Sequence, residues 1–198
     1  MVSKDPTDRP VVRKRSATKA PHPRPTGVTV KTIWSEDHEA YVVALEAADD
    51  VVVTLTPVMA FDHARGVLAA AHRAAYDAAV VNQLTTKLNL PLNTVATVAN
   101  LIRDERSRLD PADTDPLRFE PGVDGKTLRP YITVSVGIEP VGQWSVAEAD
   151  GHARTVLSAV EKANLDTVYH QVLTATMGMD EWRAKNMVAD VGTFRRYN

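Results

Sequence analysis

The chain repeats part of its own pattern after 89 residues, and this spacing is the strongest constraint on its fold. Shifted by 89 residues without gaps, "HARGVLAA" (63–70) falls on "HARTVLSA" (152–159). The helical patterns that contain these segments both follow a hydroxyl residue, Thr56 in the first half and Ser145 in the second. Two copies are too few for a solenoid. We therefore expect an internal duplication, packed as a pseudo-twofold pair around one core.

Each half begins with strand patterns and continues into a long helix. Period-2 alternation and β-branched residues indicate antiparallel strands. Thr56 is a good N-cap and Pro57 suits the first helical position. Ser145 is followed by Glu148 three residues later, the spacing of a capping box. The expected strands are 28–34, 41–46 and 51–56, then 117–120, 130–136 and 142–145; the expected helices are about 57 to 79 and 146–173.

The fold class that follows is α+β, with each copy holding an antiparallel sheet, a long helix and a two-helix corner. The segment 104–116 is polar, has two prolines and reads as a linker. This divides the chain into an N-terminal arm (1–26), a first repeat (27–103), the linker, and a second repeat (117–198).

The N-terminal arm differs from the rest of the chain in charge. Residues 1–26 hold seven basic and two acidic residues, whereas residues 27–198 hold 16 basic and 23 acidic ones. The arm has few apolar residues, so we expect it to be disordered or extended. It either binds phosphates or an acidic partner surface, or serves as a solubilising tail. The candidate phosphate-binding residues are Arg13, Lys14, Arg15, Lys19 and Arg24.

The segment "LTTKLNLPLNTVATV" (84–98) spaces apolar residues around a turn. Asn89 lies at the turn, and asparagine tolerates the left-handed backbone region that such a turn requires. Pro91 then opens the second helix. The apolar positions are Leu84 and Leu88 on the first helix, then Leu90, Val95 and Val98. This spacing resembles the helix-turn-helix of bacterial and phage DNA-binding proteins, although Thr85 stands where that motif usually has alanine.

The second copy keeps the same spacing, with Gly178 at the turn and Thr174 matching Thr85. Its apolar positions are Leu173, Met177, Met179, Ala184 and Met187. The two copies differ on the helix that would read DNA. The first offers side chains that can reach base edges or phosphates; the second opens with Asp180 and Glu181, which phosphates would repel. The candidate DNA-contacting residues are therefore confined to the first copy: Asn93, Thr94, Thr97, Asn100 and Arg103.

No enzyme signature is present, and we expect no catalytic residue, metal or cofactor. The chain has no cysteine, which excludes thiol nucleophiles and thiolate metal sites. His63 and His152 lie near helix starts and have no second ligand at i+4, so we expect them to contact the neighbouring copy or the sheet. The segment "SEDHE" (35–39) is interpreted as a polar turn. Trp34 and Trp144 are interpreted as core anchors.

Two functions remain open at this point. The first is a non-catalytic DNA-binding protein that uses the basic arm and the first-copy helix. The second is a structural or assembly protein of a phage or mobile element, making protein contacts, including with further copies of itself.

The whole chain is also loosely similar to proteins of high-GC bacteria and their phages. No apolar run is long enough to span a membrane and no secretory signal is visible, so we expect a cytoplasmic or virion-associated protein without a membrane partner.

Overall fold

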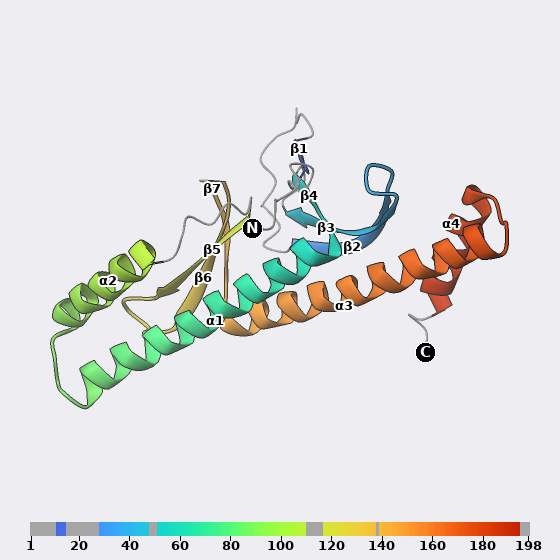
Figure 1. Cartoon of the computed structure of the whole chain (residues 1–198). Helices are drawn as coiled ribbons and strands as arrows, with labels where there is room; N and C mark the ends of the chain where they lie inside the picture. The colour runs from blue at the N-terminus through green and yellow to red at the C-terminus, as the bar shows by residue number, and fades with distance from the viewer. Residues whose placement is uncertain (1–10, 15–27, 48–50, 110–116, 138, 195–198) are drawn as a thin grey trace, which may run out of the picture.

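A computed structural model describes residues 11–14, 28–47, 51–109, 117–137 and 139–194. Within these ranges the protein has two antiparallel sheets and four α-helices, which confirms the α+β class (Figure 1). Sheet A has the strand order β1-β4-β3-β2, and sheet B has the order β5-β6-β7. The elements are β1 (Val11–Lys14), β2 (Val28–Ser35), β3 (Ala40–Ala47), β4 (Val51–Leu55), α1 (Pro57–Thr86), α2 (Leu92–Leu109), β5 (Leu117–Val123), β6 (Pro130–Val136), β7 (Glu139–Trp144), α3 (Val146–Gln171), the π-helical turn η1 (Val172–Thr176) and α4 (Glu181–Phe194).

The strands of sheet A lie close to the positions that alternation predicts. β2 and β3 form a hairpin in continuous register, from Val28 opposite Ala47 to Ser35 opposite Ala40. β4 then pairs with the other edge of β3. A fourth strand comes from the predicted arm, since β1 pairs antiparallel with β4. Of the arm, only residues 11–14 are described, so the prediction for the remainder lies outside the described residues.

Sheet B has longer outer strands than the sequence predicts. β5 continues three residues past the expected end, through Pro121 and Gly122. β7 starts at Glu139 rather than 142, and the register shifts between Val134 and Ser135. Proline lacks the N–H that a central strand must donate, and both β5 and β7 are edge strands, where proline is tolerated. The proline and glycine residues of sheet B therefore do not end its strands where the sequence predicts.

Side-chain caps fix the starts of both long helices, as predicted. The Thr56 side chain accepts a hydrogen bond from the backbone N–H of Met59, with an N···O distance of 3.4 Å. At α3 the capping box is complete: Ser145 Oγ accepts from Glu148 N at 3.2 Å, and Glu148 Oε2 accepts from Ser145 N at 2.6 Å. These bonds satisfy N–H groups that have no partner within the helix.

The two long helices pack on each other, and each lies mainly across the sheet of the other half (Figure 1). On the α3 side, Thr167 Oγ1 accepts a hydrogen bond from the backbone N–H of Tyr41 in β3, at 3.0 Å. On the α1 side, the His63 ring lies against Phe119 of β5, with centroids 5.2 Å apart. Small side chains let the helix backbones approach closely. The buried alanines of these helices include Ala60, Ala64, Ala71, Ala74, Ala149, Ala153 and Ala163.

The helical corners differ from the prediction in one respect. α1 does not end near residue 79 but continues to Thr86, so the first helix of the expected corner is the last part of α1. Leu88 is consequently not helical and is 62% exposed, which corrects its placement as a packing residue of the first helix. The turn residues are as predicted, with positive φ at Asn89 (50°) and Gly178 (65°).

The predicted linker is also partly helical. α2 starts at Leu92 and continues to Leu109, so it includes residues 104–109. Residues 110–116 lie outside the described residues, and the division of the chain into repeats and linker stays a prediction.

Candidate functional site

Helix α2 exposes the polar face that the sequence predicts. Asn93, Thr94, Thr97 and Asn100 are exposed, and Arg103 is half-buried. The opposite side of the helix carries Val95, which is fully buried. Among the described residues, nothing from the second half of the chain covers Asn93, Thr94, Thr97 or Asn100, so a partner can reach them.

Several of these side chains are already used in local hydrogen bonds. Asn93 Oδ1 accepts from Thr94 N at 2.9 Å, and Thr97 Oγ1 donates to the Asn93 carbonyl at 3.0 Å. Arg103 Nη1 donates to Asn100 Oδ1 at 3.5 Å. These five residues can offer amide and hydroxyl groups to a ligand, and Arg103 is the one among them that carries a positive charge for phosphate contacts.

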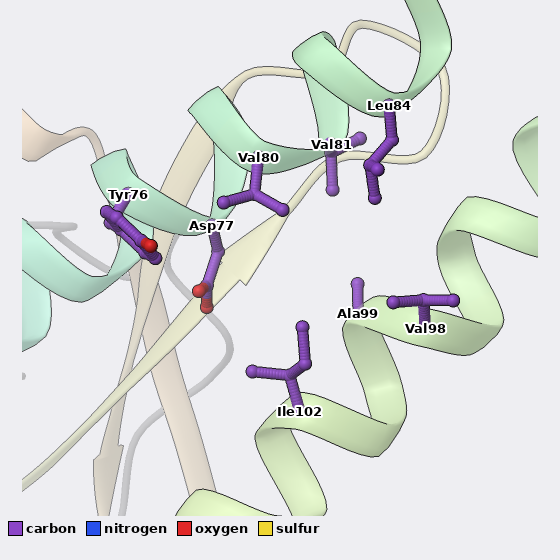
Figure 2. A pocket seen from close by; sticks show the side chains of 8 residues that line it. All are labelled: Tyr76, Asp77, Val80, Val81, Leu84, Val98, Ala99 and Ile102. Carbon is purple, nitrogen blue, oxygen red and sulfur yellow. The ribbon is translucent and has the colours of Figure 1, made fainter. Parts of the chain in front are cut away.

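Helix α2 runs back along the end of α1 (Figure 1), and the apolar sides of the two helices face each other. Figure 2 shows Val98 lying toward Leu84, and Ile102 toward Asp77 nearer the middle of α1. The cavity between these side chains has a volume of about 20 Å³, room for roughly one water molecule. The packing is that of an antiparallel helical hairpin, and the cavity is too small for an organic ligand.

The structure does not bring the described part of the arm to α2. Arg13 and Lys14 lie in β1, opposite Val52 and Val51 of β4 in sheet A, whereas α2 packs against the end of α1. The other three candidate residues of the arm, Arg15, Lys19 and Arg24, lie outside the described residues. The two parts of the predicted DNA interface are thus attached to different elements.

His63 and His152 meet where α1 and α3 cross. Their Nε2 atoms are 3.3 Å apart, and the residues are only 4% and 8% exposed. Each histidine contacts the other half of the chain, as expected. One imidazole must donate and the other accept, which requires that the accepting ring be neutral. Phe119 and Trp144 pack around the pair. Burial, and next the charge of His63, lower the pKa of His152 to about 4.

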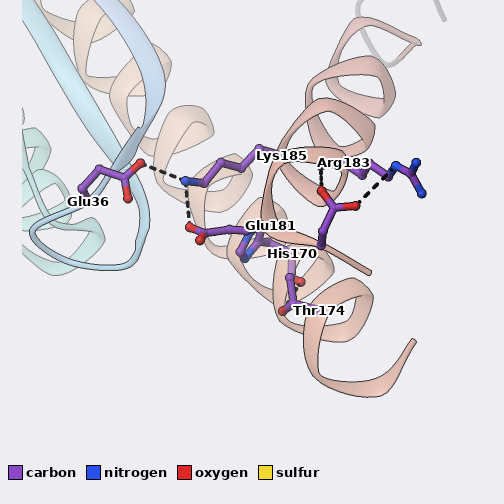
Figure 3. A network of polar contacts seen from close by, with 7 residues as sticks. Glu36, His170, Thr174, Glu181, Arg183 and Lys185 are labelled. Atoms are coloured by element: carbon purple, nitrogen blue, oxygen red, sulfur yellow. Dashed lines mark hydrogen bonds and ion pairs between the residues drawn. The ribbon is translucent and has the colours of Figure 1, made fainter. Parts of the chain in front are cut away.

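A second polar cluster, which the sequence analysis missed, joins α4 to sheet A (Figure 3). Lys185 of α4 lies 2.8 Å from Glu36 in the β2–β3 turn and 2.8 Å from Glu181 one helical turn earlier. Its Nζ is also 4.5 Å from the centre of the Trp34 ring, within cation–π range. Hydrogen bonds to Glu181 and then Glu36 raise the pKa of Lys185, and the bond from Lys185 is the main cause that lowers the pKa of Glu36.

This cluster continues inward through His170. The imidazole stacks at a tilt on Trp34, with centroids 4.3 Å apart, and lies edge-on to Tyr41. His170 is 7% exposed, and its Nε2 has no hydrogen-bond partner among the described residues. The residues Trp34, Tyr41 and His170 therefore form an aromatic contact between sheet A and α3, which fits the interpretation of Trp34 as a packing residue.

The distal half of α3 and the start of η1 expose a row of apolar side chains. We call this row, Leu165, Val168, Tyr169 and Val172, the α3 stripe. Its members are 48%, 54%, 46% and 46% exposed, in that order. The α-helical spacing i, i+3, i+4 places Leu165, Val168 and Tyr169 on one face of α3, and Val172 follows as the first residue of the π-helical turn η1. Between residues 163 and 179 the only Asp, Glu, Lys, Arg or His residues are Asp166 and His170, and both are buried. The stripe thus lies in a region without exposed charge.

Other kinds of site are not found in the described part of the chain. There is no group of three or more His, Cys, Asp or Glu residues placed to hold a metal ion. None of the described helices combines the length and apolar character needed to cross a membrane. No protein-family model matches this chain, and comparison with curated proteins and with solved structures also gives no match.

Proposed function

We propose that this protein is a non-catalytic structural or assembly protein that acts through protein–protein contacts of its body. The observation that supports this proposal is the α3 stripe. Single exposed apolar residues are ordinary on protein surfaces, but contiguous apolar patches are characteristic of interaction sites. Interface centres are also depleted in charged residues, as this region is.

The same proposal includes the internal duplication. Supporting it, the order of sheet, long helix and shorter helix occurs in both halves of the chain. His63 and His152, which are 89 residues apart, contact each other. The left-handed residues Asn89 and Gly178 have the same separation. A duplicated body offers related surfaces on its two halves, and sequence differences between the halves then decide which surface a partner uses.

A photo-crosslinking amino acid at position 169 tests the function. We expect a discrete adduct with another protein chain, and we expect Val168→Lys to remove it because a charge at the centre of an apolar contact is costly to bury. The matched control places the crosslinker at Tyr76, an exposed tyrosine on α1. Absence of any adduct at position 169, or an adduct that survives Val168→Lys, would contradict a contact through the stripe.

DNA binding is the second candidate, because the polar face of α2 is accessible. In this case the arm provides the phosphate contacts and Asn93 and Thr97 contact bases. If all five candidate residues of the arm (Arg13, Lys14, Arg15, Lys19 and Arg24) contact phosphates, the plot of log affinity against log salt has a slope of about −4.5.

The test is binding to duplex DNA at several salt concentrations. Changing these five candidate residues to glutamine is preferable to deleting the arm, since deletion also removes β1. We expect the slope to approach zero in this variant, and Asn93→Ala with Thr97→Ala to reduce discrimination between sequences. No binding by the unmodified chain at low salt would exclude this function.

A further inference from the structure

We propose that residues 15–27 pack across the face of sheet A that points away from the helices, and are a built-in partner of that sheet. We call this face, which includes Val42 and Ala44 of β3, the outer face. The inference goes beyond the proposed function, because it concerns a different surface from the α3 stripe and does not depend on it.

The outer face is buried at its centre. Val42 and Ala44 are 0% and 2% exposed. Successive side chains of a strand point to opposite faces. The alternate residues Tyr41, Val43 and Leu45 belong to the core that α1 and α3 share. Val42 and Ala44 are not among the residues of that core, so another part of the molecule covers them.

The described elements do not supply this cover. Within the described ranges, the helices that pack on β3 are α3 and α1, and both contribute their buried residues to the core on the other face. On β2, Ile33 lies opposite Val42 and is 38% exposed, and Lys31 opposite Ala44 is exposed too. A sheet face that is open to solvent would leave a valine beside these residues partly exposed. Because these exposures are those of a single chain, the covering atoms belong to this chain and lie outside the described residues.

Residues 15–27 are the segment outside the described residues whose two ends lie at opposite edges of sheet A. They join β1 to β2, and these strands form the two edges of the sheet. Lys14 and Val28 lie in one cross-strand row with Val51 and Ala47, so the ends of the segment are three strand spacings apart, or about 14 Å. Because the helices occupy the other face, the outer face is the open route between the two edges.

The length and composition of the segment fit this route. Val42 is five residues along β3 from Ala47, so a path from Lys14 to the middle of the face and back to Val28 has two legs of about 18 Å each. Thirteen residues of extended chain reach about 40 Å. The segment holds three basic residues and no acidic one, which complements a body with more acidic than basic residues. Its basic side chains are then held on the body rather than in a free tail.

The absence of cysteine allows a test by thiol labelling. Ala44→Cys places a thiol on the outer face, and Val43→Cys places one on the opposite face of the same strand as the matched control. Each is made in the full chain and in a chain where a glycine–serine linker of about six residues replaces residues 15–27. Such a linker spans about 20 Å, enough to join the two edges but too short to pass over Ala44. We expect the short linker to accelerate labelling of Ala44→Cys at least about tenfold and to leave Val43→Cys slow.

A point variant of the full chain provides the second measurement. Ile33→Lys puts a positive charge beside the basic segment and should also accelerate labelling of Ala44→Cys. Val58→Lys adds the same charge at a valine that is 72% exposed on α1, and it should have no effect.

Equal labelling of Ala44→Cys with the native segment and the short linker overturns the inference. So does acceleration on removal of residues 1–10 but not with the short linker, because those residues would then be the cover. If Val43→Cys also labels fast with the short linker, that chain is not folded and Ile33→Lys decides, with unchanged labelling counting against the inference. None of these results concerns the α3 stripe, so a failure here leaves the proposed function standing.

Discussion

The buried histidine pair makes a sharp prediction about acid stability. His63 and His152 share a contact of 3.3 Å between their Nε2 atoms, and the pKa of His152 is lowered from 6.5 to about 4, first by burial and next by the charge of His63. The perturbation is a decrease in pH, and the expected response is a loss of folding free energy between these two pKa values.

The sign and size follow from proton linkage. Above pH 6.5, His152 is neutral in the folded and the unfolded chain, and its contribution does not change with pH. Between pH 6.5 and about 4 the unfolded chain binds a proton that the folded chain does not, so the free energy of unfolding falls as pH falls. Below about pH 4 the loss is complete. At 1.36 kcal/mol for each pKa unit, the loss is about 3 kcal/mol.

Urea unfolding at pH 7, at intermediate pH and near pH 4 measures this loss. His152→Gln retains a group that can hydrogen bond to His63 but does not titrate, so its stability should fall less over the same pH range. Carboxylates also titrate in this pH range, and the difference between the variant and the unmodified chain cancels their contribution. The matched control is His72→Gln, which changes an exposed histidine on α1 and should leave the acid response as it is.

Equal acid losses in His152→Gln and the unmodified chain would refute the reasoning. A spectroscopic check avoids dependence on the variant: in the folded chain at about pH 5, the imidazole resonances of His152 should be those of the neutral ring. A charged His152 ring in the folded state at that pH would contradict the burial argument directly.

Three further predictions concern local structure. Ser145→Ala removes the acceptor of the capping box and should lower the free energy of unfolding by about 1 kcal/mol, measured by urea unfolding, with no loss contradicting the cap. Gly178→Ala should cost about 1 to 2 kcal/mol because φ is positive there, whereas Asn89→Gly at the corresponding turn should be neutral or stabilising; the opposite order would contradict the backbone argument. Lys185→Met should increase amide hydrogen exchange in α4, since it removes the ion pair that joins this helix to the β2–β3 turn, and unchanged exchange would show that packing alone holds α4.

The sequence predicts those features that depend on near neighbours. Alternation places β2, β3 and β6 close to their observed bounds, because side chains of a half-buried strand repeat every two residues. Thr56 and Ser145 mark helix starts since their side chains bond to N–H groups three residues on. Asn89 and Gly178 mark turns for a similar local reason, namely their tolerance of positive φ.

The contacts that set the tertiary arrangement are not local, and this is why they were missed. Glu36 and Lys185 are 149 residues apart, and neither residue has a neighbour in sequence that signals the pairing.

The extension of α1 to Thr86 was missed for a different reason. Residues 80–86 contain valine, asparagine and threonine side chains of lower helix propensity, but packing against α2 stabilises the helix beyond what propensity provides.

The difference between the two helical corners has a structural consequence for function. α2 contacts mainly the end of α1, whereas α4 is joined to sheet A by Lys185 and packs Val188 into the core. The residue 89 positions before Lys185 is Ala96, which cannot form such an ion pair. Similar sequence patterns thus give a corner that packs on the end of α1 and another that packs on α3 and is linked by an ion pair to the β2–β3 turn.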